Sequence, residues 1–517
     1  MKAIVSVLSA LLSSFCCLLL SRRIAHIYQL ENYQLAGFFR SIKRDLSHVV
    51  LPPLLISLAA LACYMTGLPL IGCLLIQITA SYFYYRVVEK KPGKKPFHRT
   101  ERVLRFGLIH LMVGFLFSTI LLVVARGYVL LLLPAFEIFV FAASASVAKP
   151  IERRIAKQFI DDAKQRLKGM PELKIIGITG SYGKTSTKFI LQSILSVRWR
   201  VLATPGSYNT TMGVTRVIRE MLTPNYDVFI AEMGARHIGD IRELVDLVKP
   251  SIGILTAVGA QHLDTFGTVE NVAKAKYELI EGLPSEGSAF FANDNGICKK
   301  LYEICTIKNK YLVGEILKAE QIHVSPQGTT FILNAPLSGE SVACNTKLLG
   351  KHSINNLLLC ATVAYELGLS LNEIAKGISL CKPVEHRLQL LSYGNGITVI
   401  DDAFNSNPSG AEAALEALGQ FEGRRIVVTP GMVELGREQD RFNEEFGKKI
   451  AQNADIAIII GKQNSNSITK GIKANNSFDI QQIYAVDTLS EGTKLLQGIM
   501  KAGDVILYEN DLPDNYS

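Results

Sequence analysis

The chain has 517 residues, of which 48% are hydrophobic and 20% are charged, and its formal net charge is +9. This length exceeds what a single hydrophobic core supports, so we expect roughly three or four structural units. The apolar residues are concentrated before residue 150, and many basic residues lie in short segments between apolar runs. Membrane orientation explains that charge pattern, and no nucleic-acid partner is expected.

Five apolar stretches in residues 1–150 are each long enough to cross a bilayer, which takes about 20 residues. They lie near 2–20, 47–65, 68–86, 106–124 and 127–147. The first stretch has Lys2 before its apolar core, as a signal peptide does, but Arg22 and Arg23 follow it and no A-x-A cleavage site does. An uncleaved span is therefore favoured, and we expect a helical region embedded in membrane lipid.

Basic residues near the ends of these stretches predict the orientation, because such residues are retained on the cytoplasmic side. The loops after the first and third stretches hold many of them: Arg22, Arg23, Arg40, Lys43 and Arg44, then Arg86, Lys90, Lys91, Lys94, Lys95, Arg99 and Arg102. With five spans, the N-terminus lies outside and the region after residue 150 lies in the cytoplasm, where ATP is available.

Glu137 falls inside the fifth stretch, where an acidic residue is unusual. Ionisable residues at membrane depth are often functional, so a polar contact inside the bundle or with a lipid headgroup is one interpretation. The other is a tolerated side chain buried against neighbouring helices. The residues alone leave both open.

A phosphate-binding loop is predicted after a helix-like linker at 151–170. An apolar run at 173–178 predicts a buried strand, residues 179–186 read TGSYGKTS, and a helix-like segment follows at 187–196. In this order the loop amides and the helix N-terminus face a phosphate, Lys184 neutralises the outer phosphates and Thr185 can hold magnesium. Ile178 stands where the strict pattern has glycine, but the strand and helix around the loop still predict binding of ATP with Mg²⁺.

Further motifs follow this loop in a characteristic order. They are TPGSYNT (204–210), AEMGA (231–235), QHLD (261–264), AKYE (275–278), GKH (350–352), HR (386–387) and DDAFNSNP (401–408). Over residues 171–510 the sequence resembles the Mur ligase family, whose phosphate loop has the form G-x-x-G-x-x-G-K-T-[ST]. The E-M-G-A, A-K-x-E and D-D-x-[YF]-N-x-N-P forms are most similar to the MurF branch, whose members add D-alanyl-D-alanine to UDP-MurNAc-tripeptide.

The resemblance implies a catalytic and metal-binding set. Glu232 and His262 follow strand-like runs and are similar to the family's magnesium ligands, together with Thr185. Lys276 corresponds to a lysine that is carbamylated in many members, which turns a cation into an oxygen ligand suited to magnesium. The alternative for Lys276 is a surface lysine on a helix, with Lys274 close by. The implied catalytic residues are Lys184, His262 and Lys276.

The resemblance also implies nucleotide and substrate contacts. The ATP-binding residues would be Gly180, Ser181, Tyr182, Gly183, Lys184, Thr185, Ser186, Asn293, Asp294, Arg387 and Asp402. The residues near the acceptor or the amine would be Asn209, Thr210, Phe404, Asn405, Asn407 and Glu434. Loop asparagines are also common turn formers, so their substrate roles stay open.

The predicted fold class is an α-helical membrane region plus α/β, with a P-loop Mur ligase central domain and a smaller C-terminal α/β domain. Strand-like runs at 398–400, 425–429 and 456–460 alternate with helical segments such as 410–418, which predicts the second α/β domain. The expected domains are 1–150 (membrane region), 151–170 (linker helix), 171–384 (central ATP-binding domain) and 385–517 (C-terminal domain).

Two departures from the MurF branch leave the substrate open. Those enzymes begin with a soluble domain that recognises the UDP portion, and membrane spans stand in its place here; the chain also ends without their K-G-S segment. The expected function is an ATP-dependent amide-bond ligase in the bacterial cell membrane, acting through an acyl phosphate on a cell-wall peptide precursor with an amino acid or dipeptide as the amine. One alternative is a ligase for another amino acid and a lipid-linked or non-peptidoglycan acceptor. Another is a membrane scaffold or transporter with a relic ATPase fold, which the intact Lys184, Glu232 and His262 disfavour.

Overall fold

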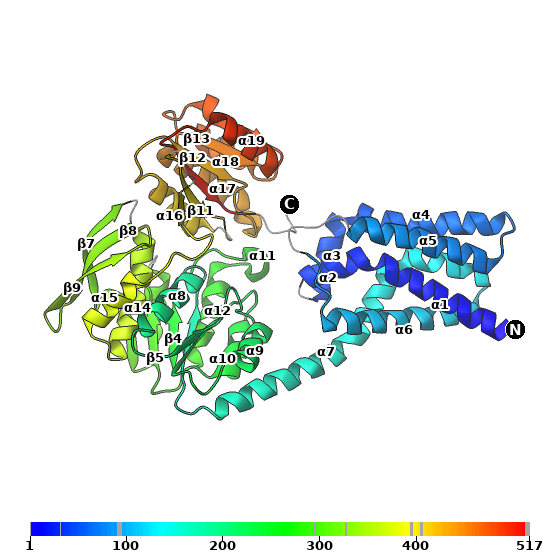
Figure 1. Ribbon diagram of the computed structural model, residues 1–517, viewed down its shortest axis with the longest axis horizontal. Coiled ribbons are helices and arrows are strands. Elements are labelled where there is room, and N and C mark those ends of the chain that lie inside the picture. The colour runs from blue at the N-terminus through cyan, green and yellow to red at the C-terminus, as the bar shows by residue number, and fades with distance from the viewer. Residues whose placement is uncertain are drawn as a thin grey trace. The chain divides into compact units, whose positions relative to one another are not determined.

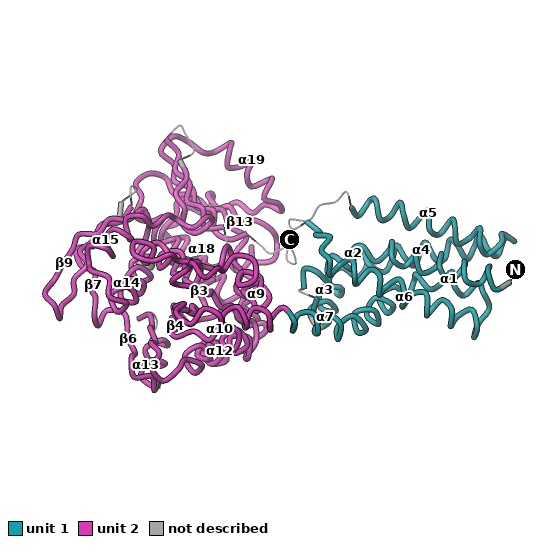
Figure 2. Tube along the Cα trace, turned by 60° about the horizontal axis from the view of Figure 1, so that its bottom comes forward, with its two compact units in different colours: residues 1–158, 517 teal, residues 159–516 magenta. Residues whose placement is uncertain are grey.

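The computed structural model describes residues 2–31, 33–89, 96–293, 296–325, 328–392, 396–403 and 407–511. The chain divides into two compact units, residues 1–158 and 159–516, which Figure 2 shows in different colours. Helix α7 (Glu137–Lys168) crosses this boundary, so its first part belongs to one unit and its last part to the other.

The first unit consists of helices in its described residues. They are α1 (Lys2–Leu20), α2 (Arg22–Leu30), α3 (Leu35–Arg44), α4 (Leu46–Met65), α5 (Leu70–Glu89), α6 (Glu101–Val124), the 3₁₀ helix η1 (Gly127–Phe136) and the start of α7. Within the described part of the chain, five segments are long and apolar enough to cross a membrane: Ala3–Leu20, Leu46–Met65, Leu70–Glu89, Glu101–Val124 and Gly127–Lys168. The fifth differs from the single helix that its sequence predicts, because it opens as η1; Pro134, inside η1, has no N–H to donate to a helical hydrogen bond.

The first unit exposes many apolar side chains and buries many polar ones, in addition to the apolar residues packed between its helices. Many large apolar side chains on its long helices are exposed, including Leu8, Leu55, Leu108, Leu116 and Val123. Many polar side chains are instead buried between the helices, including Ser13, Ser57, Gln77, Ser81, His110, Glu137 and Ser144. A helix bundle with this distribution has an outer surface suited to lipid and an interior joined by polar contacts.

Glu137 contacts His110 inside this bundle. Its place in the structure therefore fits the interpretation of a polar contact within the bundle. The Glu137 Oε1 and His110 Nε2 atoms are 3.0 Å apart, and both side chains are almost fully buried. On the other side of the ring, His110 Nδ1 lies 2.9 Å from Ser144 Oγ. The pair therefore links α6 to α7.

The second unit begins with a parallel sheet, whose strands appear in green in Figure 1. In the described residues its strands are β1 (Lys174–Thr179), β2 (Val201–Ala203), β3 (Val228–Glu232), β4 (Ile252–Leu255), β5 (Ser288–Phe291) and β6 (Asn309–Leu312), in the order β2-β3-β1-β4-β5-β6. Apolar side chains are buried on both faces of the strands, for example Ile230 on one face and Phe229 on the other, as expected for a sheet covered on both sides. Its helices include α8 (Lys184–Leu195), α9 (Thr211–Glu220), α10 (Asp240–Val248), α11 (Leu263–Phe266), α12 (Val269–Glu281) and α13 (Ile297–Ile304).

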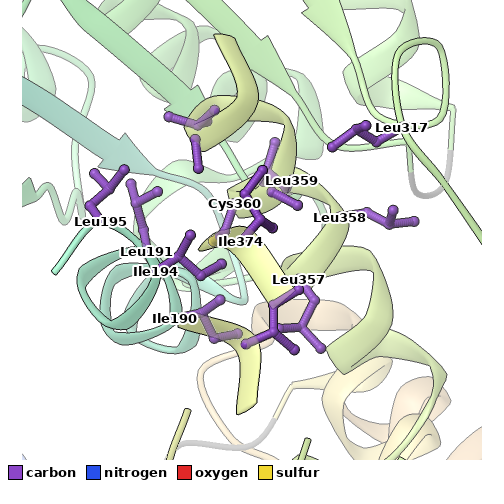
Figure 3. Packing of buried hydrophobic residues seen from close by; sticks show 14 of the residues in the cluster. Ile190, Leu191, Ile194, Leu195, Leu317, Leu357, Leu358, Leu359, Cys360 and Ile374 are labelled. Carbon is purple, nitrogen blue, oxygen red and sulfur yellow. The ribbon is translucent and has the colours of Figure 1, made fainter. Parts of the chain in front are cut away.

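Two further helices, α14 (Lys351–Glu366) and α15 (Leu371–Ser379), pack on α8 and fix its position. Figure 3 shows the buried side chains of this contact, among them Leu191 of α8, Leu357 of α14 and Ile374 of α15. A small antiparallel sheet precedes these helices: β7 (Lys318–Ser325), β8 (Gly328–Ala335) and β9 (Glu340–Thr346).

The C-terminal part of the second unit is a second α/β domain with its own sheet. In the described residues its strands are β10 (Gln389–Ser392), β11 (Thr398–Asp402), β12 (Arg425–Thr429), β13 (Ile456–Ile460), β14 (Ile483–Val486) and β15 (Val505–Glu509), in the order β10-β11-β15-β12-β13-β14. Strand β10 pairs antiparallel and the other pairs are parallel. Helices α16 (Pro408–Leu418), α17 (Gln439–Asn453), α18 (Ser465–Lys473) and α19 (Leu489–Ile499) complete it. The predicted fold class is therefore confirmed.

The topology of the first sheet determines where ligands bind. Strand β1 lies between β3 and β4; the chain continues from β1 to β2 on one side of the sheet and from β4 to β5 on the other. In open α/β sheets, ligands bind beyond the carboxyl ends of the strands at such a point. The loops after β1, β3 and β4 therefore meet at the predicted nucleotide site.

Candidate active site

The phosphate loop connects β1 to α8, as the sequence predicts, but α8 begins at Lys184 and is therefore longer at its start than expected. Gly180 has φ +153°, and a Cβ at this position would lie 2.2 Å from Thr256 Oγ1. Gly183, with φ +79°, caps the helix in a left-handed conformation. At Gly180, only glycine both adopts this φ readily and has no Cβ to collide with Thr256. The loop can therefore lie close to the residues that follow β4.

Hydrogen bonds hold this loop against the chain that follows β4. The Ser181 amide donates to the Ala257 carbonyl oxygen at 2.6 Å, and Ser181 Oγ donates to that of Gly259 at 3.1 Å. Thr256 Oγ1 donates to the Tyr182 carbonyl oxygen at 2.5 Å. The loop is thus held in a fixed shape by the protein alone, as a preformed anion site requires.

Lys184 lies over the loop from the first turn of α8. Its Nζ donates to the carbonyl oxygens of Gly180 at 2.6 Å and Ser181 at 3.1 Å. Burial lowers the pKa of Lys184 to about 8, although the charge of Glu232 opposes the shift. The ammonium group lacks an anionic hydrogen-bond partner among the described residues, and a nucleotide phosphate would provide one.

Glu232 ends β3 opposite the loop and is only 1% exposed. Its Oε1 accepts from Thr185 Oγ1 at 3.3 Å and from Asn209 Nδ2 at 3.0 Å, and its Oε2 lies 2.9 Å from Lys188 Nζ. Burial would raise the pKa of Glu232, but the charges of Lys188 and Lys184 outweigh it and hold the pKa below its usual value. The side chain is therefore an ionised carboxylate.

Lys188 is the residue of this group that the sequence analysis missed. It is fully buried on α8, one turn after Lys184, and it follows the buried Thr187. The sequence does contain one indication of this contact: Lys188 lies on the apolar face of an amphipathic helix. A lysine in such a position predicts a buried partner, because lysine is almost never fully buried unless it is paired.

His262 lies seven residues beyond β4, at the N-cap of α11, and not directly at the end of the strand. Its Nδ1 is 2.5 Å from Oε2 of Glu434, which the resemblance placed near the amine substrate. Burial lowers the pKa of His262, which favours the neutral ring. If Nδ1 carries the proton, Nε2 has its lone pair available, and a carboxylate on the other nitrogen is the usual support of a metal-binding histidine.

Lys276 is on the buried face of α12 and is 1% exposed, so it is not the surface lysine of the alternative interpretation. Its neighbour Lys274 is exposed. Burial, reinforced by the charge of Lys184, lowers the pKa of Lys276 well below its usual value. A neutral amine can react with carbon dioxide, so the setting is compatible with a carbamate.

Six of the expected nucleotide contacts line one cavity of about 590 Å³: Tyr182, Gly183, Ser186, Asn293, Arg387 and Asp402. Asn356 and Asn407 also line it. Asp402 Oδ1 accepts a hydrogen bond from the Leu388 amide at 3.1 Å, and burial raises its pKa to about 6. Burial also lowers the pKa of Arg387. Residues from both α/β domains thus meet around the phosphate loop.

Several expected substrate residues have structural partners. Thr210 caps α9, with Oγ1 accepting from the Gly213 amide at 3.3 Å. Asn407 caps α16, with Oδ1 accepting from the Gly410 amide at 2.9 Å. Asp294, Phe404 and Asn405 lie outside the described residues.

The residues present suit a magnesium ion that is held partly by nucleotide. Glu232 offers an ionised carboxylate 3.3 Å from the Thr185 hydroxyl. No group of three or more His, Cys, Asp or Glu side chains in the described part of the chain is arranged to hold a metal. Magnesium commonly uses one or two protein oxygens together with phosphate and water, so this sparse set fits it.

The site combines a phosphate loop at a switch point, a buried carboxylate opposite it and a cavity lined by two α/β domains. These features define a class of nucleotide-binding enzymes built from two α/β domains. A model of the Mur ligase middle domain matches residues 178–364, and a model of the Mur ligase, glutamate ligase domain matches residues 386–508. The chain belongs to the Mur ligase family and is an ATP-dependent carbon–nitrogen ligase. The predicted family and enzyme class are therefore confirmed.

Relatives support this assignment over the same region. The UDP-N-acetylmuramoyl-tripeptide--D-alanyl-D-alanine ligase of Mycobacterium bovis is 31% identical over 370 residues, or 65% of this chain and 70% of the relative. The enzyme of that name from Escherichia coli is 32% identical over 296 residues, or 56% of this chain and 65% of the relative. The chain thus spans slightly less than two thirds of the Escherichia coli relative.

Solved structures give the same picture. The crystal structure of MurF from Acinetobacter baumannii has a TM-score of 0.63 at 26% identity, covering 69% of this chain and 77% of that structure. MurF from Thermotoga maritima in complex with ADP shares the fold, with a TM-score of 0.62 at 24% identity over 69% of this chain and 80% of that structure. Where the family has its N-terminal domain, this chain has long apolar helices.

Proposed function

We propose that this protein joins an amine, D-alanyl-D-alanine or a similar amino acid or dipeptide, to the carboxylate of a cell-wall peptide precursor. The observation that carries the proposal is the meeting of Lys184, Glu232 and the preformed phosphate loop at one edge of the sheet. Relatives named for adding D-alanyl-D-alanine share about 30% of residues over this region, which supports the choice of amine.

The reaction has two steps. A carboxylate oxygen of the acceptor bonds to the γ-phosphorus of ATP, and ADP leaves, which gives an acyl phosphate. The amine nitrogen then bonds to the acyl carbon, inorganic phosphate leaves and the nitrogen gives up a proton. Because negative charge migrates throughout, the protein's task is to position the reactants and neutralise charge.

Each side chain has a role in that task. Lys184 would donate to the phosphate oxygens in place of the loop carbonyls, and Arg387 would approach the outer phosphates from the cavity wall. Glu232, Thr185 and His262, with a carbamylated Lys276, would hold magnesium, which when bound neutralises the phosphate oxygens and orients them. Asp402 would accept a hydrogen bond from the ribose.

We further propose that the first unit lies in the bacterial cell membrane and that residues 159–516 are cytoplasmic. The exposed apolar and buried polar side chains of the long helices support this, as do the basic loops between them. A lipid-linked precursor is a second candidate acceptor. The match to the family begins only at residue 178, and the apolar helices before it would place the enzyme beside lipid-linked molecules.

The test is release of phosphate by the detergent-solubilised protein supplied with ATP, magnesium, D-alanyl-D-alanine and UDP-MurNAc-tripeptide. We expect turnover and a product with the mass of the pentapeptide, and Lys184→Ala serves as the blank. Turnover only with a lipid-linked acceptor would move the proposal to the second candidate. Absence of amide product with either acceptor and with a panel of amino acids and dipeptides would contradict the proposed function.

A further inference from the structure

Lys188 is a buried cation with two well-defined partners. Its side chain is 0% exposed, its Nζ lies 2.9 Å from Glu232 Oε2, and it donates to the Gly206 carbonyl oxygen at 2.6 Å. Burying a lysine is costly unless its charge and hydrogen bonds are satisfied, and here both acceptors are fixed groups. The family-derived roles leave this residue unused.

The Gly206 carbonyl oxygen belongs to a loop, residues 206–209, that is connected to Glu232 at both ends. At the start of the loop, Gly206 is held through Lys188. At its end, Asn209 Nδ2 donates to Glu232 Oε1 at 3.0 Å, and the Asn209 carbonyl oxygen accepts from the Gly234 amide at 2.8 Å. A Cβ at Gly234 would lie 2.8 Å from Asn209 Cγ, so the absence of a side chain there permits this close contact.

The same loop forms part of the wall of a second cavity, of about 660 Å³. Gly206 and Ser207 line it together with Thr185 of the phosphate loop, Phe189 of α8 and Arg387. Because Thr185 and Arg387 belong to the expected phosphate site, this cavity adjoins that site on the side of the loop. A group that binds here would contact the loop, and Lys188 contacts the same loop at the Gly206 carbonyl oxygen.

We propose that Lys188 is a positioning residue that holds the Gly206–Asn209 loop on Glu232, so that the carboxylate-bearing acceptor meets a cavity wall aligned with the magnesium-binding carboxylate. This inference rests on the proposed function for the identity of the acceptor but not for the tether itself. A lysine that only neutralised Glu232 would stabilise the fold without affecting the loop separately. The two roles therefore predict different results.

The experiment compares Lys188→Met, which removes both hydrogen bonds, with Lys188→Arg, which can keep them. Lys300→Met is the matched control, because Lys300 is an exposed lysine on α13 outside the site. The first readout is amide hydrogen exchange of the full-length, detergent-solubilised protein without ligands. We expect residues 204–210 of Lys188→Met to exchange about tenfold faster or more, as loss of a charge-assisted hydrogen bond implies, while residues 288–291, which form β5, stay unchanged.

The second readout separates the substrates. We expect Lys188→Met to raise the KM for UDP-MurNAc-tripeptide by about tenfold, with the KM for ATP within about twofold of the unmodified protein and with Lys188→Arg partly restored. If Lys188→Met does not fold, Lys188→Gln, which still donates to one acceptor, replaces it.

Unchanged exchange in residues 204–210, equal acceleration in β5, or an equal rise of both KM values would overturn the proposal. A local change in exchange in a protein that makes no amide product would leave the tether standing and refute only the proposed function.

Discussion

Asp402 has a half-buried carboxyl group whose protonation links stability to pH. Its pKa is raised to about 6 by burial, whereas in the unfolded chain an aspartate titrates near 3.9. The folded state therefore holds the proton more tightly, so the free energy of unfolding falls as pH rises from about 4 to about 6. Well above pH 6 the full cost of ionising this half-buried group remains.

We predict that Asp402→Asn is more stable than the unmodified protein at pH 7 to 8, by up to roughly 3 kcal/mol, and that the gain disappears near pH 4. The side-chain oxygen of asparagine can still accept from the Leu388 amide. Thermal unfolding of both proteins across this pH range measures the difference. A gain that did not depend on pH would show that the carboxyl is not the titrating group.

Lys276 and Lys274 lie on the same helix, one buried and one exposed, and so form a matched pair. We predict that Lys276→Ala lowers kcat by roughly 10–100-fold, the range typical of lost metal support, because the variant cannot form the proposed carbamate. Bicarbonate will not restore this variant, whereas short carboxylic acids should do so in part. Lys274→Ala should retain activity. Full activity of Lys276→Ala without added acid would remove the carbamate assignment.

At the scale of elements, the sequence predicts those features whose signal is local. The apolar run that becomes β1, the glycine-rich loop and the strands β12 and β13 depend on neighbouring residues, and the structure has them where the pattern indicates. The contact of His262 with Glu434 joins residues 172 positions apart. No periodicity within either segment could predict it, because it depends on how two separate α/β domains pack.

The pairing of α6 with α7 gives a prediction for the helix bundle. His110 and Glu137 are almost fully buried and face each other at 3.0 Å. Removing one partner leaves the other buried without the group opposite it, which typically costs about 3–5 kcal/mol, whereas replacing both with apolar side chains is often neutral. We therefore predict that His110→Leu or Glu137→Leu alone lowers the thermal stability of the detergent-solubilised protein, and that the double variant recovers most of the loss.

Comparison of the three variants with the unmodified protein in a thermal aggregation assay checks this prediction. The exposed Leu108→Ala on the same helix is a suitable control, since its side chain faces outward. If the double variant is as unstable as the sum of the single variants, the pair has no mutual interaction and each residue acts separately.

At the scale of the whole molecule, the sequence predicts an apolar helical region followed by a ligase core, because hydropathy changes sharply near residue 150. The sequence does not predict where the first unit ends, because α7 continues without a break from Glu137 to Lys168. The last part of α7 belongs to the second unit. Ala163 is buried in the same apolar cluster as Phe229, and Asp162 pairs with Arg219 at 2.7 Å. Packing, not composition, decides this boundary.

This boundary allows the two proposed roles of the apolar helices to be separated. A variant that begins at residue 159 retains every packing contact of the second unit described above, so we predict that it folds and binds an ATP analogue within about threefold of the full chain. A variant that begins at residue 171 also loses Ile160, Ala163 and Leu167 from the apolar cluster, and should be less stable by roughly 2–4 kcal/mol.

Activity then distinguishes an anchor from a substrate-binding region. If the helices only anchor the enzyme, the variant from residue 159 should use UDP-MurNAc-tripeptide as well as the full chain does. If they present a lipid-linked acceptor, the variant should keep ATP binding but lose turnover of that acceptor, because the chemistry resides in one unit and access to the substrate in the other. Loss of ATP binding in this variant would contradict both roles, since the phosphate loop, Glu232 and Asp402 would then depend on helices outside their own unit.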